Sequence, residues 1–238
     1  TEFEDGGRIM DSTGALLLKD VPERLLVVGG GYVGLELGSV YAALGSEVTV
    51  VEMLDRVLAN SDEDLARPLV NRIDEIFGAV YTDTKVAEME EGEDEVTVTL
   101  DGDVEDKEQA FDRVLVAIGR RPNSKNLGLE NTDVEVDDRG FIQVDDRQRT
   151  ADDHIFAIGD VVGGMMLAHK AMYEGKIAAE VIAGLPAAFD AAAIPAVVYT
   201  DPQLAWAGLT EQEAEKAERD IEVARFPWRA SGRALTMD

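Results

Sequence analysis

The feature that most constrains the fold is a strand–glycine–helix–strand pattern over residues 25–52. Residues 25–28 form a short apolar run without charge, which is typical of a strand buried on both faces of a parallel sheet. Gly29, Gly31 and Gly34 follow in the spacing G-x-G-x-x-G. Glycines at this spacing permit a tight turn, close approach of the backbone to a pyrophosphate, and close packing of helix on strand. The pattern therefore predicts a dinucleotide-binding βαβ unit.

The expected helix of this unit has apolar residues at intervals of three and four, namely Val33, Leu37, Val40 and Leu44. We expect this face to pack on the sheet and Gly45 to end the helix. Two alternatives are a glycine-rich turn in an ordinary α/β domain and a membrane span. The membrane span is disfavoured because residues 25–45 contain six glycines and Glu36.

Glu52 stands at the end of the second strand of the unit, where a dinucleotide site holds the adenosine ribose. A carboxylate there accepts hydrogen bonds from a free 2′-hydroxyl and repels a 2′-phosphate. The position therefore favours NAD over NADP.

The rest of the chain continues as alternating helices and strands. A helix over residues 62–77 is expected to begin with a capping box of Ser61 and Asp64. A second capping box, formed by Thr210 and Glu213, predicts another helix start near the end of the chain. A third helix is expected over residues 167–183, with strands at 79–82, 86–89, 96–100, 111–118, 137–144, 155–158, 196–200, 204–208 and 221–226.

Composition restricts the partners. The chain has 49 acidic and 22 basic residues, a formal net charge of −27, which argues against binding nucleic acid or an anionic membrane. This acid-rich, lysine-poor balance is similar to that of proteins from salt-loving archaea. We interpret the acid-rich segment 88–108 as a solvated hairpin face, because its spacing does not match a calcium loop.

Cysteine is absent, so this chain can form neither a disulfide nor a thiolate site. His154 and His169 are the two histidines, and the spacing of His, Asp and Glu suggests no metal site. The sequence starts without the pattern of a signal or transit peptide, from which we expect a cytoplasmic protein.

Five stretches in order resemble one known family. They are GGGYVGLE (29–36), AIGRRPN (117–123), IFAIGDV (155–161), LAHKAMYEGKIAAEVIAG (167–184) and PAVVYTDPQLAWAGLTEQEA (195–214). Together they resemble the flavin-dependent pyridine nucleotide-disulfide reductases, and within that family the branch of the dihydrolipoyl dehydrogenases. The resemblance covers nearly the whole chain.

The resemblance implies an α/β fold in which a Rossmann-like NAD domain is inserted into a second Rossmann-like domain that binds FAD. Residues 1–20 and 124–189 would belong to the FAD domain and residues 21–123 to the NAD domain. Residues 190–238 would start an α+β dimer-interface domain, which implies a homodimer. The family's redox cysteine pair and its C-terminal His–Glu pair do not occur, so we interpret the sequence as a central fragment without catalytic residues of its own.

The resemblance also implies where the cofactors bind. Residues expected at the NAD site are Gly29, Gly31, Tyr32, Val33, Gly34, Glu36, Glu52, Val86, Gly119 and Arg120, and those at the FAD site are Asp160, Leu167, Ala168 and His169. Tyr32 would cover the flavin until nicotinamide displaces it, or simply pack at the helix start. Glu36 would lie near the nicotinamide, or be a plain surface acid. Asp160 would accept a hydrogen bond from the ribityl chain of FAD, or cap a strand end.

Residues 167–169 would begin a helix whose N–H groups face the flavin C2 carbonyl. The implied reaction is the oxidation of dihydrolipoamide by NAD, through FAD and a redox disulfide outside this chain. Its partner would be the lipoyl-bearing acyltransferase of a 2-oxoacid dehydrogenase complex or another lipoyl protein. Alternatives are an NADH oxidase, a coenzyme A disulfide reductase or a transhydrogenase on the same scaffold, and a non-catalytic NAD-sensing module.

Overall fold

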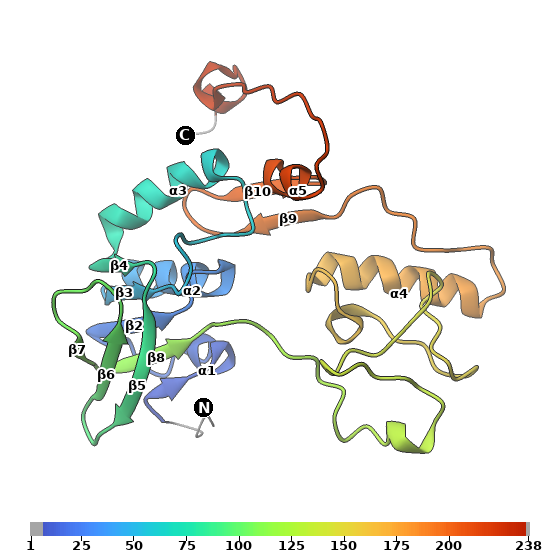
Figure 1. Ribbon diagram of the computed structural model, residues 1–238, viewed down its shortest axis with the longest axis horizontal. Coiled ribbons are helices and arrows are strands. Elements are labelled where there is room, and N and C mark those ends of the chain that lie inside the picture. The colour runs from blue at the N-terminus through green and yellow to red at the C-terminus, as the bar shows by residue number, and fades with distance from the viewer. Residues whose placement is uncertain (1–6, 237–238) are drawn as a thin grey trace.

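The computed structural model describes residues 7–236, and its first unit is built on a five-stranded parallel sheet (Figure 1). The strands are β1 (Ile9–Met10), β2 (Arg24–Val28), β3 (Glu47–Val51), β4 (Ala79–Tyr81) and β8 (Arg113–Val116). Their order is β1-β8-β2-β3-β4, and every pairing is parallel. From β2 the chain continues to β3 and β4 on one side and later returns to β8 on the other, so β2 and β8 flank the point where such sheets bind ligands.

The sheet is covered on both faces, which explains its uninterrupted apolar runs. Leu25, Val27 and Val50 are fully buried on the face covered by helices. Leu26 and Val114 pack on the other face against an antiparallel sheet of β5 (Lys85–Glu91), β6 (Val96–Asp101) and β7 (Glu108–Phe111). The predicted hairpin of residues 86–89 and 96–100 is confirmed.

Helix α2 (Tyr32–Ala43) forms as predicted but turns a different face to the sheet. Its buried residues are Gly34, Leu35, Gly38 and Tyr41, whereas Val40 and Leu44 are about half exposed. A Cβ on Gly38 would lie 3.2 Å from Phe77 Cζ, so the glycines let the helix approach the core closely. Of the predicted face, Leu37 packs partly buried against the core. Apolar side chains occur on all sides of this helix, so their periodicity only partly identified the buried face.

Helix α3 (Glu63–Ile76) is confirmed, but its predicted capping box is wrong. Asp62 is the N-cap residue, and the Ser61 hydroxyl donates to the Leu58 carbonyl instead. The Asp62 carboxylate accepts hydrogen bonds from the Glu211 N–H at 3.0 and 3.1 Å. The Asp62 carboxylate thus binds the start of α5, 149 residues away, and α3 begins without a side-chain capping hydrogen bond.

The strand predicted over residues 111–118 is confirmed at Arg113–Val116, as β8, but Phe111 belongs to β7, because the chain changes sheets at Asp112. The Asp112 carboxylate accepts hydrogen bonds from the backbone N–H and the guanidinium of Arg24, both at 2.8 Å. Burial opposes ionisation of Asp112, but these hydrogen bonds hold its pKa below the ordinary value. The carboxylate thereby anchors the crossover to the start of β2.

Residues 9–16, part of the range 1–20 that was expected to end the first FAD-domain segment, lie against the first unit. β1 pairs with β8, and the short helix α1 (Ser12–Leu16) follows it. The Tyr41 hydroxyl of α2 donates to the Ala15 carbonyl at 2.8 Å. Backbone pairing and a buried hydrogen bond therefore tie this segment to the sheet; residues 1–6 of the expected range lie outside the described residues.

The second unit follows β8 through an extended segment and is irregular except for three elements (Figure 1). These are helix α4 (Ala168–Ile182), as predicted, and the 3-10 turns η1 (Leu129–Asn131) and η2 (Gly159–Val162). Residues 137–144 were expected to form a turn and a strand, and the turn is present, with the Gly140 N–H donating to the Asp137 carbonyl at 2.9 Å. The strand predicted there and the one at residues 155–158 are wrong. Each segment makes a single bridge within residues 7–236, and a strand requires a longer paired neighbour.

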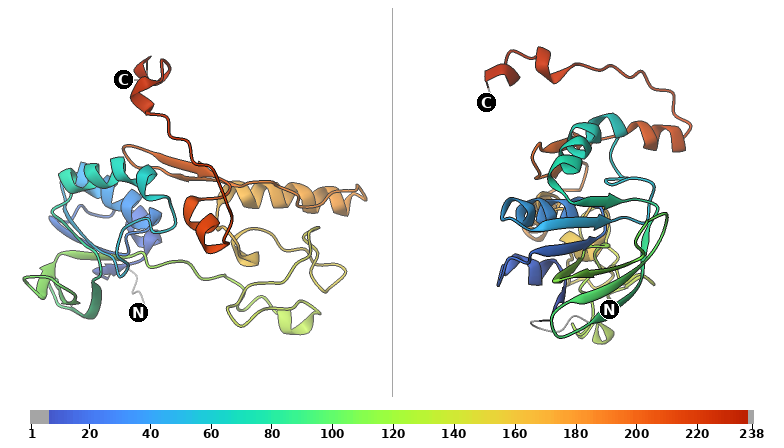
Figure 2. Two further views of the ribbon diagram at one scale, coloured as in Figure 1. Left: turned by 45° about the horizontal axis from the view of Figure 1, so that its top comes forward. Right: turned by 90° about the vertical axis from the view of Figure 1, so that its left-hand side faces the viewer.

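The C-terminal part begins with an antiparallel hairpin of β9 (Pro195–Val198) and β10 (Leu204–Ala207), which packs on the core of the first unit. Helix α5 (Glu211–Lys216) begins with the predicted capping box of Thr210 and Glu213. The predicted strand 221–226 is wrong, because this exposed segment pairs with no other strand among residues 7–236. Figure 2 shows it leading away from the body to η3 (Trp228–Ala230) and η4 (Ala234–Thr236). None of the helices in residues 7–236 has both the length and the apolar content that a bilayer crossing requires.

The attachment of residues 9–16 can be tested with Tyr41→Phe. Burial raises the pKa of the Tyr41 hydroxyl, which therefore stays protonated and donates to Ala15. Its removal should lower the free energy of unfolding by about 1 kcal/mol in a urea titration. Tyr81→Phe is the control, since this half-buried hydroxyl makes no hydrogen bond within residues 7–236. Equal losses in both variants would contradict the assignment.

Candidate functional site

The glycine turn lies where β2, β3 and β8 end. The Gly29 N–H donates to the Val51 carbonyl at 2.8 Å, and the Ala117 N–H donates to the Val28 carbonyl at 2.8 Å. Gly29 has a φ of +109°, and a Cβ there would lie 2.5 Å from the Ala117 carbonyl oxygen. Only glycine meets both conditions, so the first glycine of the motif is fixed by the turn and by the neighbouring strand end.

The other two motif glycines differ in what surrounds them. A Cβ on Gly34 would collide with the Gly29 carbonyl oxygen, so Gly34 sets the closeness of α2 to the turn. A Cβ on Gly31 would meet nothing within 4 Å, and Gly31 is exposed. Space is thus left open directly at the helix N-terminus, which fits the expectation that a pyrophosphate approaches the backbone there.

Glu52 points back to the glycine turn. Its carboxylate accepts hydrogen bonds from the Gly30 N–H at 2.7 Å and from the Leu54 N–H at 2.8 Å, one at each oxygen. Each oxygen has a second lone pair, so the anchored carboxylate can still accept from a ribose hydroxyl. Sequence reasoning missed Gly30, although a fourth glycine, between the first two of the motif, was a signal. A Cβ on Gly30 would lie 2.6 Å from Val57 Cγ1.

The N-terminus of α2 can receive an anion. Gly31 is its N-cap residue, and no side chain makes a capping hydrogen bond there. The N–H groups of the first turn, which includes Tyr32 and Val33, and the helix dipole therefore favour negative charge at this point. The Thr84 N–H donates to the Glu52 carbonyl at 3.0 Å, which places the start of β5 beside the acid. Half-buried Val86, predicted to touch adenine, follows two residues later.

Residues predicted for two different cofactors meet at Arg120, just after β8. Its Nη1 lies 2.9 Å from Asp160 Oδ2, and its Cζ lies 5.9 Å from the centre of the Tyr32 ring. Gly119 precedes Arg120. It has a φ of +127°, and a Cβ added there would meet no atom within 4 Å. The structure thus brings Tyr32 and Arg120 of the expected NAD site together with Asp160 of the expected FAD site.

Two other predicted residues contact the chain around β9. Glu36 Oε1 accepts a hydrogen bond from the Tyr199 N–H at 2.8 Å, and the His169 Nε2–H donates to the Pro195 carbonyl. The sequence shows no sign of these contacts, because Tyr199 and Pro195 take part through backbone atoms. Leu167 is the N-cap residue of α4 without a side-chain capping hydrogen bond, so the N–H groups that follow, from Ala168 onward, are available as predicted.

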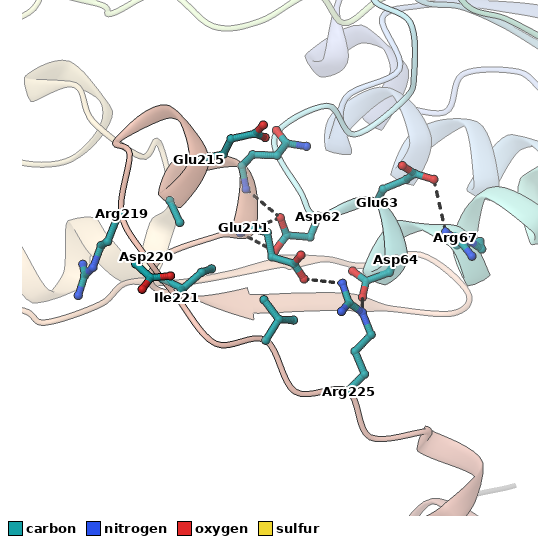
Figure 3. A pocket seen from close by; sticks show the side chains of 13 residues that line it. Asp62, Glu63, Asp64, Arg67, Glu211, Glu215, Arg219, Asp220, Ile221 and Arg225 are labelled. Atoms are coloured by element: carbon teal, nitrogen blue, oxygen red, sulfur yellow. Dashed lines mark hydrogen bonds and ion pairs between the residues drawn. The ribbon is translucent and has the colours of Figure 1, made fainter.

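A hollow of about 570 Å³ lies between the start of α3 and α5 (Figure 3). Arg225 points between Asp64 and Glu211 and forms an ion pair with each. The hydrogen bond from Arg225 lowers the pKa of Asp64. None of the residues predicted to bind NAD or FAD lines this hollow. It is a charged contact between the first unit and the C-terminal segment.

Comparison with protein families agrees with this geometry. Residues 1–175 match the family described as pyridine nucleotide-disulphide oxidoreductase. Residues 194–238 match the dimerisation domain of the same family.

Individual relatives are similar over nearly all of this chain. It is 49% identical to the dihydrolipoyl dehydrogenase of Haemophilus influenzae over 97% of the chain and 48% of that protein. It is 48% identical to dihydrolipoyl dehydrogenase 2 of Haloarcula marismortui over 98% of the chain and 50% of that protein. The flavoprotein disulfide reductase RclA of Escherichia coli is 32% identical with a TM-score of 0.85, over 97% of this chain and 53% of RclA. The chain thus spans about half the length of these relatives.

The different surroundings of the two glycines predict different effects of one added methyl group. Gly34→Ala should lower the free energy of unfolding by about 1 to 3 kcal/mol, because the Cβ collides with the Gly29 carbonyl. Gly31→Ala should leave it nearly unchanged, because the Cβ enters open space. Urea titrations of both variants make the comparison. A loss in Gly31→Ala as large as that in Gly34→Ala would show that the turn is packed differently.

Proposed function

This chain belongs to the pyridine nucleotide-disulphide oxidoreductase family, and we propose that it is the central part of a dihydrolipoyl dehydrogenase. The complete protein would oxidise dihydrolipoyl groups with NAD, through FAD and a redox disulfide that lies outside residues 1–238. The single observation that carries the proposal is the glycine turn with its anchored Glu52, open at Gly31. When bound, FAD and NAD supply the electron and hydride transfer.

On the NAD side, the role of this chain would be to bind and orient the dinucleotide. The N–H groups at the start of α2 would hold the pyrophosphate, where Gly31 leaves room and Val33 lies in the first turn. Glu52 would accept from the adenosine ribose, with Val86 near the adenine. Tyr32, Glu36, Gly119 and Arg120 would border the nicotinamide half. The hydrogen bonds from Gly30 and Leu54 support this assignment, because they fix the Glu52 carboxylate before any ligand arrives.

On the FAD side, Asp160 would accept a hydrogen bond from the ribityl chain. Its second oxygen pairs with Arg120, which leaves lone pairs for a ligand hydroxyl. The uncapped start of α4, at Leu167, Ala168 and His169, would direct N–H groups at the flavin and stabilise negative charge there. His169 would position the helix through its hydrogen bond to the Pro195 carbonyl and take no part in proton transfer.

The domain boundaries and partners belong to the same proposal. Residues 124–189 would complete the FAD domain, and residues 190–238 would begin the dimer-interface domain of a homodimer. The partner would be a lipoyl-bearing acyltransferase or another lipoyl protein, in the cytoplasm. The net charge of −27 and a halophilic relative support adaptation to concentrated salt.

The role of Glu52 can be tested with Glu52→Gln in the full-length protein. Loss of the negative charge should raise the dissociation constant for NADH about tenfold and lower that for NADPH, because the repulsion of a 2′-phosphate disappears. Fluorescence titration measures both constants. The control is Glu47→Gln, at the opposite end of β3. Unchanged constants in Glu52→Gln would place the ribose elsewhere.

The charge predicts a dependence on salt. Raising KCl from about 0.1 M to about 1 M shortens the screening length from about 10 Å to about 3 Å. The melting temperature of the full-length protein should rise with it, since repulsion among the surface acids weakens. Differential scanning fluorimetry across this range makes the test. A melting temperature independent of salt would contradict the proposed adaptation.

A further inference from the structure

One buried ion pair stands apart from the other charges of the molecule. Lys170 and Glu174 are 6% and 3% exposed, and they are the only charged residues among the buried ones of the part that the structure describes. They lie one turn apart on α4, with Lys170 Nζ 2.6 Å from Glu174 Oε1. A buried ion pair is seldom required for stability, because apolar residues of similar volume often replace it without loss. Its presence here calls for another explanation.

Glu174 uses its second oxygen to hold a turn. Its Oε2 accepts a hydrogen bond from the Gly159 N–H at 2.7 Å, and Gly159 directly precedes Asp160 in η2. Gly159 has a φ of +80°, and a Cβ there would lie 3.2 Å from Ala171 Cβ. The turn therefore packs directly against α4. Its left-handed conformation at Gly159 lets the Gly159 N–H donate to Glu174.

Lys170 lies near the other end of the same turn. A Cβ on Gly164, just after η2, would lie 3.5 Å from Lys170 Cε. The ammonium group lies beside the buried carboxylate and offsets its charge. Glu174 thus holds the turn at Gly159, and Lys170 lies near Gly164 at its other end.

Asp160 lies between these two points, and its side chain leaves the turn on the exposed side. It is 43% exposed at the side chain and pairs with Arg120. From these contacts we propose that Glu174 is a positioning residue for Asp160, acting through the Gly159 N–H, with Lys170 as its counter-charge. This inference rests on the proposed binding of FAD at Asp160 and adds the group that fixes the position of that carboxylate.

Two double variants of the full-length protein separate positioning from simple packing. Lys170→Met/Glu174→Gln removes both charges but keeps an amide oxygen that accepts from the Gly159 N–H. Lys170→Met/Glu174→Met removes both charges and the acceptor. Both should fold, because each replaces the pair with side chains of similar volume. Circular dichroism of the apoproteins confirms the fold before FAD is added.

The readout is the dissociation constant of FAD, from quenching of flavin fluorescence on titration into apoprotein. Lys170→Met/Glu174→Met should bind FAD about tenfold more weakly than wild type, and Lys170→Met/Glu174→Gln should stay close to wild type. The matched control is Lys176→Met/Glu180→Met, an exposed pair with the same spacing on α4, which should leave the constant unchanged.

Equal FAD constants in the Met/Gln and Met/Met variants at positions 170 and 174 would overturn the inference, because the acceptor would then not matter. A wild-type protein that takes up no FAD would overturn the proposed function and this inference together. Normal uptake by wild type with equal constants in the two variants overturns the inference alone.

Discussion

The close contact between the first turn of α2 and the Gly29 backbone is the constraint on which the rest of the site depends. Gly34 has no Cβ, so the helix starts directly above the end of β2. This position leaves Gly31 open and places the Gly30 N–H where Glu52 can accept from it. A larger residue at position 34 would move the helix start, and with it the N–H groups that favour an anion. The absence of a Cβ at Gly34 thus determines the position of both parts of the proposed dinucleotide site, the N–H groups for the pyrophosphate and the Glu52 carboxylate for the ribose.

The two proposed cofactor sites are joined by electrostatic contacts rather than by a shared core. Arg120 contacts the Tyr32 ring on one side and the Asp160 carboxylate on the other. Behind Asp160, the buried Lys170–Glu174 pair holds the backbone of the turn. In a chain with a net charge of −27, most acids lie at the surface, where salt screens them. Two of the ion pairs, Arg120–Asp160 and Lys170–Glu174, lie where the expected NAD and FAD residues meet.

The sequence was most informative where local chemistry decides the structure. The glycine spacing, the apolar runs of β2 and β3 and the capping box of Thr210 and Glu213 depend on neighbouring residues, and all are confirmed. Predictions failed where a distant partner decides. The Asp62 carboxylate accepts a hydrogen bond from the start of α5, and the chain changes sheets at Asp112. Residues 137–144 and 155–158 each form a single β-bridge in place of a strand. Contacts of Glu36 and Glu174 were missed because each accepts from a backbone N–H, which the sequence does not reveal.

A crystal structure of the full-length protein with NADH tests the central claim most directly. It should show the pyrophosphate within hydrogen-bond distance of the N–H groups at the start of α2, beside Gly31. A hydroxyl of the adenosine ribose should bind the carboxylate of Glu52. A nucleotide bound away from the glycine turn, or a ribose that makes no contact with Glu52, would contradict the account.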